Sequence, residues 1–143
     1  MQKTKTVPVD TEGFWAKSSI KCANPLKMTQ DMVEKSKEAC KPIEYKNAEY
    51  IGRYLIPRNF LRYNDEEQPR DKNNDIDHVN KLRNDFEVNG YNIGCPPPIC
   101  CFDYESNSPY ELKGQSGFNR CEAYNGIGQE LIIVDIYEYE SKM

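Results

Sequence analysis

Apolar residues follow a helical period in one long segment of the chain. They fall at Ile76, Val79, Leu82 and Phe86, the spacing that places side chains on one face of a helix. Asp75, just before this series, is a residue type that caps helix N-termini, and Gly90 suits the C′ position after the last turn. The pattern therefore predicts a helix over residues 75–90.

Other segments have the composition of strands, with aromatic or β-branched residues, and prolines end the first of them and open the second. These segments are EYIGRYLIP (49–57), CPPPICCFDY (95–104), YEL (110–112) and ELIIVDIYEY (130–139). A polar loop, Lys113 to Gly117, and a short helix that opens near Arg120 are predicted before the last strand.

The predicted order of elements is strand, helix, strand, strand, helix, strand, which indicates one small domain over residues 48–140. Its expected fold class is α/β (α+β), with a mixed sheet flanked by helices. Residues 1–47 are predicted to form an N-terminal extension. Within it, Thr29 is suited to cap a helix that runs to Cys40, before Pro42 stops it.

Composition limits the classes of protein to which this chain can belong. With 143 residues, 38% hydrophobic content and 29% charged content, the chain can bury a modest core. Its net charge of −4 disfavours a protein that coats nucleic acid by charge alone, since phosphate neutralisation needs clustered lysine and arginine. Residues 50–64 nevertheless contain three arginines and no acidic residue, which indicates either a local basic groove or a solvated strand face.

The chain has no feature of a membrane or secreted protein. No segment approaches the ~18 consecutive apolar residues of a membrane span, and the N-terminus lacks the apolar part of a secretory signal. We therefore expect a cytoplasmic protein; its compact size and its content of asparagine and tyrosine suggest a phage or mobile element, and then the host cytoplasm. The six cysteines are expected to be reduced there. They form no Cys-x-x-Cys pair and His78 is the one histidine, so no metal site is predicted.

The loop after the third predicted strand carries candidate chemistry. Gly114 and Gly117 allow positive φ and a close approach of a ligand to the backbone. Ser116, Asn119 and Arg120 add a hydroxyl, an amide and a forked cation. Free N–H groups at a helix N-terminus bind anions, and arginine matches phosphate geometry. The loop therefore predicts a phosphate or nucleotide pocket, with an empty turn as the alternative.

Residues 50–139 resemble the ParB/sulfiredoxin-like superfamily in the order of their elements and in several motifs. The matching motifs are Ile56-Pro57 with Asn59, Pro69-Arg70, Pro97-Pro98-Ile99, the Gly-x-x-Arg-x-x-Ala turn of Gly117, Arg120 and Ala123, and Gly128. The resemblance implies a stand-alone ParB-like domain that binds nucleotide or DNA phosphate, with ATP or CTP and Mg²⁺ as cofactors. Such a domain is expected to act as a nuclease or a nucleotide hydrolase.

Carried over to this chain, the resemblance implies a set of phosphate-facing residues. In the turn these are Gly114, Gln115, Ser116, Gly117, Asn119 and Arg120. His78 stands where sulfiredoxins have a phosphate-contacting lysine, and Arg70 stands where the family has an arginine ahead of the first helix. An exposed helix residue and an ion-paired loop residue are the alternatives for these two.

The sequence defines the catalytic group less well than the phosphate site. Glu122, on the helix after Arg120, and Glu111, on the strand before the loop, are the candidate carboxylates for phosphodiester cleavage. An exposed helix carboxylate is the alternative for Glu122. The competing hypothesis for the whole chain is a non-catalytic adaptor with a degenerate pocket, which binds a protein partner through residues 1–47.

Reduction of a cysteine sulfinic acid, the sulfiredoxin reaction, is not expected. In the resemblance, Phe118 and Asn119 replace the cysteine and the histidine of the sulfiredoxin motif, and the reaction needs a thiolate. Cys121 lies three residues later on the helix and is expected to point elsewhere.

Overall fold

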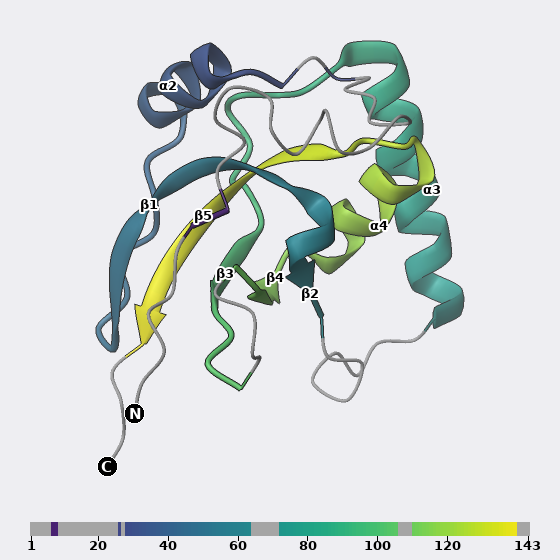
Figure 1. Cartoon of the computed structure of the whole chain (residues 1–143). Helices are drawn as coiled ribbons and strands as arrows, with labels where there is room; N and C mark the ends of the chain where they lie inside the picture. The colour runs from purple at the N-terminus through teal and green to yellow at the C-terminus, as the bar shows by residue number, and fades with distance from the viewer. Residues whose placement is uncertain (1–6, 9–25, 27, 64–71, 106–109, 140–143) are drawn as a thin grey trace.

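The structure is a computed structural model, which describes residues 7–8, 26, 28–63, 72–105 and 110–139 (Figure 1). Its elements are α2 (Gln30–Ala39), β1 (Ala48–Pro57), the 3-10 helix η2 (Arg58–Phe60), β2 (Leu61–Arg62), α3 (Lys72–Asn89), β3 (Ile99–Phe102), β4 (Leu112–Ser116), α4 (Phe118–Gly126) and β5 (Leu131–Tyr139). The predicted order of strands and helices after Ala48 is confirmed, with the short strand β2 in addition.

The strands form one mixed five-stranded sheet in the order β1-β5-β3-β4-β2. The C-terminal strand β5 lies between β1, to which it is antiparallel, and β3, to which it is parallel. β4 is antiparallel to β3 and parallel to β2. Helices α3 and α4 pack against each other, and α2 packs against β1 (Figure 1). The expected α+β class with a mixed sheet is confirmed.

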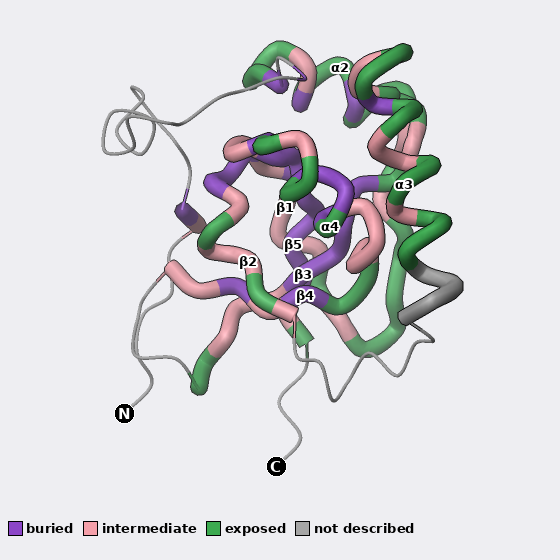
Figure 2. The backbone as a smooth tube through the Cα atoms, turned by 90° about the vertical axis from the view of Figure 1, so that its right-hand side faces the viewer, coloured by how far each residue is buried: buried purple, intermediate pink, exposed green. Residues whose placement is uncertain are grey.

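Strand β5 is the centre of the hydrophobic core. Its residues from Ile132 to Tyr137 are all buried, as the central strands in Figure 2 show, because the strand has a neighbour on each side and both of its faces are covered. Phe86 of α3 stacks on Tyr124 of α4 with ring centroids 4.9 Å apart. Val33 of α2 joins the same core, so α2 packs on the domain rather than standing apart from it.

The three arginines of residues 50–64 do not form one basic groove. Arg53 is buried and pairs with Asp135, its Nε lying 2.7 Å from Oδ1. Arg62 is exposed, and its Nε lies 3.1 Å from Oε2 of Glu111. Arg58 lines a cavity beside α4. Because the strand turns into η2 after Pro57, the three guanidinium groups go to different environments.

Helix α3 begins earlier than the sequence predicted. It starts at Lys72, so Asp75 lies inside the helix, and its assignment as the N-cap is wrong. The first turn consists of polar residues only, so a prediction based on apolar spacing could not detect it. At the other end, Gly90 has a φ of 75° and its N–H donates to the carbonyl of Phe86 at 3.0 Å, which confirms the C′ assignment.

Strand β4 also differs from its prediction. It runs from Leu112 to Ser116, so Lys113 to Ser116, predicted as a loop, form a strand paired with β3. Tyr110 and Glu111, predicted as strand, precede it. The backbone pairing with β3 and β2 overrides the low strand propensity of glycine and lysine. The phosphate-site candidates Gly114, Gln115 and Ser116 therefore lie on a strand.

The N-cap of α2 is confirmed. The Thr29 hydroxyl accepts a hydrogen bond from the Met32 N–H at 3.3 Å. We expect Thr29→Ala to lower the free energy of unfolding by about 1 kcal/mol, because a free amide of the first turn loses its acceptor. Urea denaturation monitored by circular dichroism measures the change, and Thr29→Ser is the control that keeps the acceptor. Equal stability of the two variants would mean that the cap contributes nothing.

Candidate functional site

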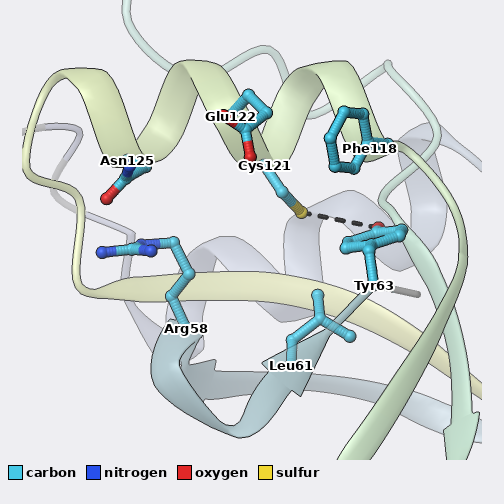
Figure 3. A pocket seen from close by; sticks show the side chains of 7 residues that line it. All are labelled: Arg58, Leu61, Tyr63, Phe118, Cys121, Glu122 and Asn125. Carbon is cyan, nitrogen blue, oxygen red and sulfur yellow. Dashed lines mark hydrogen bonds between the residues drawn. The ribbon is translucent and has the colours of Figure 1, made fainter. Parts of the chain in front are cut away.

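A cavity of about 210 Å³ lies between one face of α4 and the chain that follows β1 (Figure 3). From α4 it is lined by residues at helical spacing, and from the opposite side by residues of η2, β2 and the position after β2. The lining residues are Arg58, Leu61, Tyr63, Phe118, Cys121, Glu122 and Asn125. The α4 members share a face because positions i, i+3, i+4 and i+7 coincide on a helix.

Tyr63 forms the aromatic end of the cavity. Its ring meets Phe118 edge to face, with centroids 5.4 Å apart. Its hydroxyl donates to the carbonyl of Ser116 at 2.5 Å and lies 3.6 Å from Sγ of Cys121. A Cβ at Gly114 would lie 2.3 Å from the tyrosine ring. The missing side chain of Gly114 therefore makes room for Tyr63, which explains a glycine inside a strand.

The other end of the cavity is polar. Arg58 Nε donates to the carbonyl of Gln129 at 2.9 Å, and none of the described residues accepts a hydrogen bond from its terminal nitrogens. Asn125 and Glu122 extend from α4 on the facing side (Figure 3). The cavity therefore offers cationic donors, an amide and a carboxylate at one end and two aromatic rings at the other.

Within the part of the chain that the structure describes, the N-terminus of α4 has no side-chain cap. The N-cap residue is Gly117, with a φ of 83°, and no side chain within the described residues accepts from the first turn. The first helical hydrogen bond runs from the Cys121 N–H to the Gly117 carbonyl at 3.0 Å. The N–H groups that precede it lack an acceptor within the helix, and the helix dipole makes their surroundings favourable for an anion.

Arg120 and Asn119 lie in this first turn but do not line the cavity. A terminal nitrogen of Arg120 donates to the Pro96 carbonyl. The Oδ1 atom of Asn119 is buried and has no hydrogen-bond partner among the described residues. Arg120 also acts on Tyr91: burial raises the pKa of Tyr91 to about 12, while the nearby guanidinium opposes the rise. The arginine therefore faces the segment before β3.

The remaining predicted residues are dispersed. His78 is exposed on α3, Gln115 Nε2 lies 3.4 Å from Sγ of Cys101, and Arg70 falls outside the described residues. Glu111 faces Arg62 and does not line the cavity, whereas Glu122 does. The structure thus brings Glu122 to the cavity and Gly117, Asn119 and Arg120 to the adjoining helix end.

Cys121 does not point away from Phe118, as the sequence led us to expect, but lines the same cavity (Figure 3). The prediction was wrong because residues three apart share a helix face. Burial raises the pKa of the Cys121 thiol to about 11, although the hydrogen bond with Tyr63 lowers it. Thiolate is scarce at neutral pH, so this cysteine is poorly suited to nucleophilic chemistry.

Arg58, Leu61, Tyr63 and Asn125 are cavity residues that sequence reasoning missed. Asn125 could have been found, since it continues the face that begins at Phe118. Among the described residues, no group of three His, Cys, Asp or Glu side chains is placed to hold a metal ion. No helix in the described part of the chain is long and apolar enough to cross a membrane.

The mixed five-stranded sheet and its helices, together with the likeness to a solved structure, show the fold class of this protein: it has the ParB/sulfiredoxin-like fold. Neither a protein-family model nor a curated protein matches the sequence. Among solved structures, the chain is similar to the C-terminally truncated chromosome-partitioning protein ParB from Caulobacter crescentus complexed with CTP-gamma-S. The identity is 17% and the TM-score 0.51, over 63% of this chain and 46% of that chain.

Two further structures have a lower TM-score of 0.43. Sulfiredoxin from Arabidopsis thaliana is 19% identical, over 59% of this chain and 82% of that chain. A Pnob8-like ParB-N domain is 17% identical, over 68% of this chain and 33% of that chain. This chain spans less than half the length of the Caulobacter ParB structure, and the likeness at these identities shows the fold alone.

Proposed function

We propose that this protein binds a nucleoside triphosphate, with the nucleoside in the cavity beside α4 and the phosphates at the uncapped N-terminus of the helix. The observation that carries the proposal is that these two features adjoin. Phe118 is both the first residue of α4 and part of the cavity wall. A ligand that joins a ring system to an anionic group matches this arrangement.

The chemistry of the cavity supports a nucleoside. The rings of Tyr63 and Phe118 offer apolar surface to a base or a sugar. Glu122 can accept hydrogen bonds, and Arg58 and Asn125 can donate them. Such a combination of aromatic walls and a few polar groups is typical of small-molecule sites.

The phosphates are assigned to the backbone amides of the first turn of α4 and to the guanidinium of Arg120. Arg120 keeps further N–H donors besides the one that holds the Pro96 carbonyl, so it can bind an anion without releasing that segment. Arg58 lies at the other, polar end of the cavity, opposite Asn125, and is assigned to the nucleoside rather than to the phosphates (Figure 3). The Caulobacter ParB structure contains CTP-gamma-S, so CTP is the first nucleotide to test, followed by ATP and GTP, each with and without Mg²⁺.

Arg58→Ala and Arg120→Ala are expected to lose nucleotide binding. For the unmodified protein, a triphosphate at about 100 times its dissociation constant should stabilise the fold by about 2.7 kcal/mol, which a thermal-shift measurement detects. The matched control is Arg62→Ala, which removes the same charge from an exposed side chain outside the cavity and should keep the full shift. Circular dichroism checks that each variant is folded.

The proposal fails if no triphosphate shifts the unmodified protein, or if folded Arg58→Ala and Arg120→Ala both bind as the unmodified protein does. Short DNA in the same screen separates a DNA-phosphate site from a nucleotide site. A shift with DNA and with no triphosphate would replace the nucleotide proposal by the nuclease hypothesis.

Glu122 is the carboxylate that we assign to hydrolysis of the bound nucleotide, because it lines the cavity. A general base must reach the water that it activates, and Glu111 instead faces Arg62. Glu122→Gln should therefore keep the thermal shift while it loses phosphate release. Unchanged release by Glu122→Gln would remove this residue from the mechanism and leave the binding proposal intact.

A further inference from the structure

A second cavity, of about 440 Å³, lies under the connection between α2 and β1. Its walls come from residues 41–45 of that connection, from Ala48 and Tyr50 of β1, and from Tyr137 of β5. It shares no lining residue with the cavity beside α4. Whatever it binds is therefore independent of the nucleotide proposal.

Three tyrosine rings surround this cavity at different angles. Tyr45 and Tyr137 have centroids 5.1 Å apart and planes at 79°, and Tyr50 and Tyr137 have centroids 5.2 Å apart and planes at 56°. Tyr137 is 1% exposed and Tyr45 is 41% exposed. The buried ring of Tyr137 packs against both of the other rings and holds them in place, and Tyr45 offers the most accessible ring surface.

The hydroxyl groups of the two inner tyrosines are already engaged. Tyr50 donates to Oδ1 of Asp135 at 3.0 Å, and Tyr137 donates to the carbonyl of Ile43 at 2.5 Å. Burial raises the pKa of Tyr137 to about 12, so this phenol is neutral at physiological pH. A phenol that donates to a carboxylate gains electron density in its ring, which strengthens the attraction of the ring face for a cation.

The lining residues other than the tyrosines favour one kind of cation over another. Pro42, Ile43 and Ala48 provide apolar surface, which suits methyl groups better than N–H donors. A cation without N–H donors leaves no hydrogen-bond donor unsatisfied in such a site, and the ring faces can stabilise its charge. Glu44 also lines the cavity and forms no ion pair with any described residue, so a carboxylate is at hand to balance the charge.

From these observations, we propose that the three-tyrosine cavity binds a methylated ammonium group. Ring faces of tyrosine and a nearby carboxylate are the chemistry that recognises quaternary ammonium ions. The group can belong to a free choline-type molecule or to a methylated lysine of a partner protein. Both sources present the same cation, and the experiment separates them.

Choline is the first probe, and 3,3-dimethyl-1-butanol, its neutral carbon analogue of the same shape, is the paired control. Titration followed by NMR or calorimetry should detect choline and give at least about tenfold weaker binding for the neutral analogue, as a cation–π contribution requires. A peptide with trimethyl-lysine and the same peptide with unmodified lysine form the second arm. Tighter binding of the methylated peptide than of choline identifies a protein partner; the reverse identifies a small molecule.

Variants test the role of the rings. Tyr45→Ala should weaken choline binding about tenfold, whereas Tyr45→Phe keeps the ring and should keep the affinity. Tyr139→Ala is the matched control, since Tyr139 is 42% exposed, close to Tyr45 in exposure, and does not line the cavity. Tyr45 is a surface residue, so these variants are expected to fold, and circular dichroism checks it.

Lys41 tests whether the cavity binds a cation or an anion. It lines the cavity and repels a bound cation, so Lys41→Gln should tighten choline binding, and Glu44→Gln should weaken it. Weaker binding by Lys41→Gln would indicate an anion site and overturn the proposal. Equal binding of choline and its neutral analogue would also overturn it, because the cavity would then be only an apolar pocket.

Discussion

Replacing Asp135 with asparagine is expected to lower the free energy of unfolding by about 3–5 kcal/mol, measured by urea denaturation at neutral pH. The side chains of Asp135 and Arg53 are 4% and 0% exposed, and two N–H groups of the arginine contact the two carboxylate oxygens at 2.7 and 2.9 Å. Asparagine keeps the shape of the side chain but leaves a buried guanidinium without its counter-charge.

The arginine has further partners, which make the loss larger than that of an isolated pair. Arg53 also donates to the carbonyls of Ser36, at 2.8 Å, and of Cys40, at 2.7 Å. It therefore ties the C-terminal end of α2 to β1. If the guanidinium moves toward water in Asp135→Asn, these carbonyls lose their donor too.

The matched control for Asp135→Asn is Glu111→Gln, which breaks the ion pair with Arg62. The arginine side chain of that pair is 72% exposed, so the change should be under about 1 kcal/mol. Equal losses for the two variants would show that the buried pair contributes no more to the free energy of unfolding than the exposed pair does.

Gly117→Ala is expected to have the second largest effect. Gly117 has a φ of 83°, a conformation that costs other residues about 1–2 kcal/mol. In addition, a Cβ at this position would lie 2.8 Å from Cα of Pro98, and overpacking of this kind costs about 1–3 kcal/mol. The clash is with backbone, so no side-chain rotation relieves it.

Gly128→Ala separates the two contributions. Gly128 has a φ of 74°, close to that of Gly117, but a Cβ there would meet nothing within 4 Å. Thermal or urea unfolding measures the free energy of unfolding of the two variants. Gly128→Ala should lose only the cost of the positive φ, and Gly117→Ala should lose clearly more. Equal losses would mean that the Pro98 segment yields freely and does not fix the position of α4.

Gly117→Ala should also reduce nucleotide binding, under the function proposed above, because Pro98 and α4 cannot both keep their places. The Pro98 carbonyl accepts a hydrogen bond from the N–H of Asp135 at 3.0 Å, so the segment is held by β5 and the helix is more free to move. A folded Gly117→Ala protein with the affinity of the unmodified chain would argue against the helix N-terminus as the phosphate site.

The sequence predicted well the elements in which burial determines where the apolar residues lie. The apolar spacing from Ile76 to Phe86 placed α3, and the run of isoleucine and valine placed β5. Val79, Leu82 and Phe86 of α3 and the buried residues of β5 contact the core, whereas Ile76 is 56% exposed. The start of α3 and the extent of β4 were missed because their residues are polar, and pairing or capping rather than burial decides them.

The candidate site was predictable only in part. The turn around Gly117 follows from glycine and arginine spacing and from the resemblance. The cavity beside it depends on Arg58 and Tyr63, which are far from α4 in the sequence and reach it only because β1 ends beside β5 and β2 pairs with β4. No local pattern shows that Tyr63 packs on Gly114.

The place of β5 in the sheet bears on how the protein folds. β1 pairs with β5 along its whole length, from Ala48 with Tyr139 to Pro57 with Leu131, and β3 also needs β5 as its neighbour. The first and last described strands must therefore meet across most of the chain, a long-range closure that slows folding. Until β5 arrives, β1 and β3 have unpaired edges, and the growing chain is most prone to aggregation at that stage.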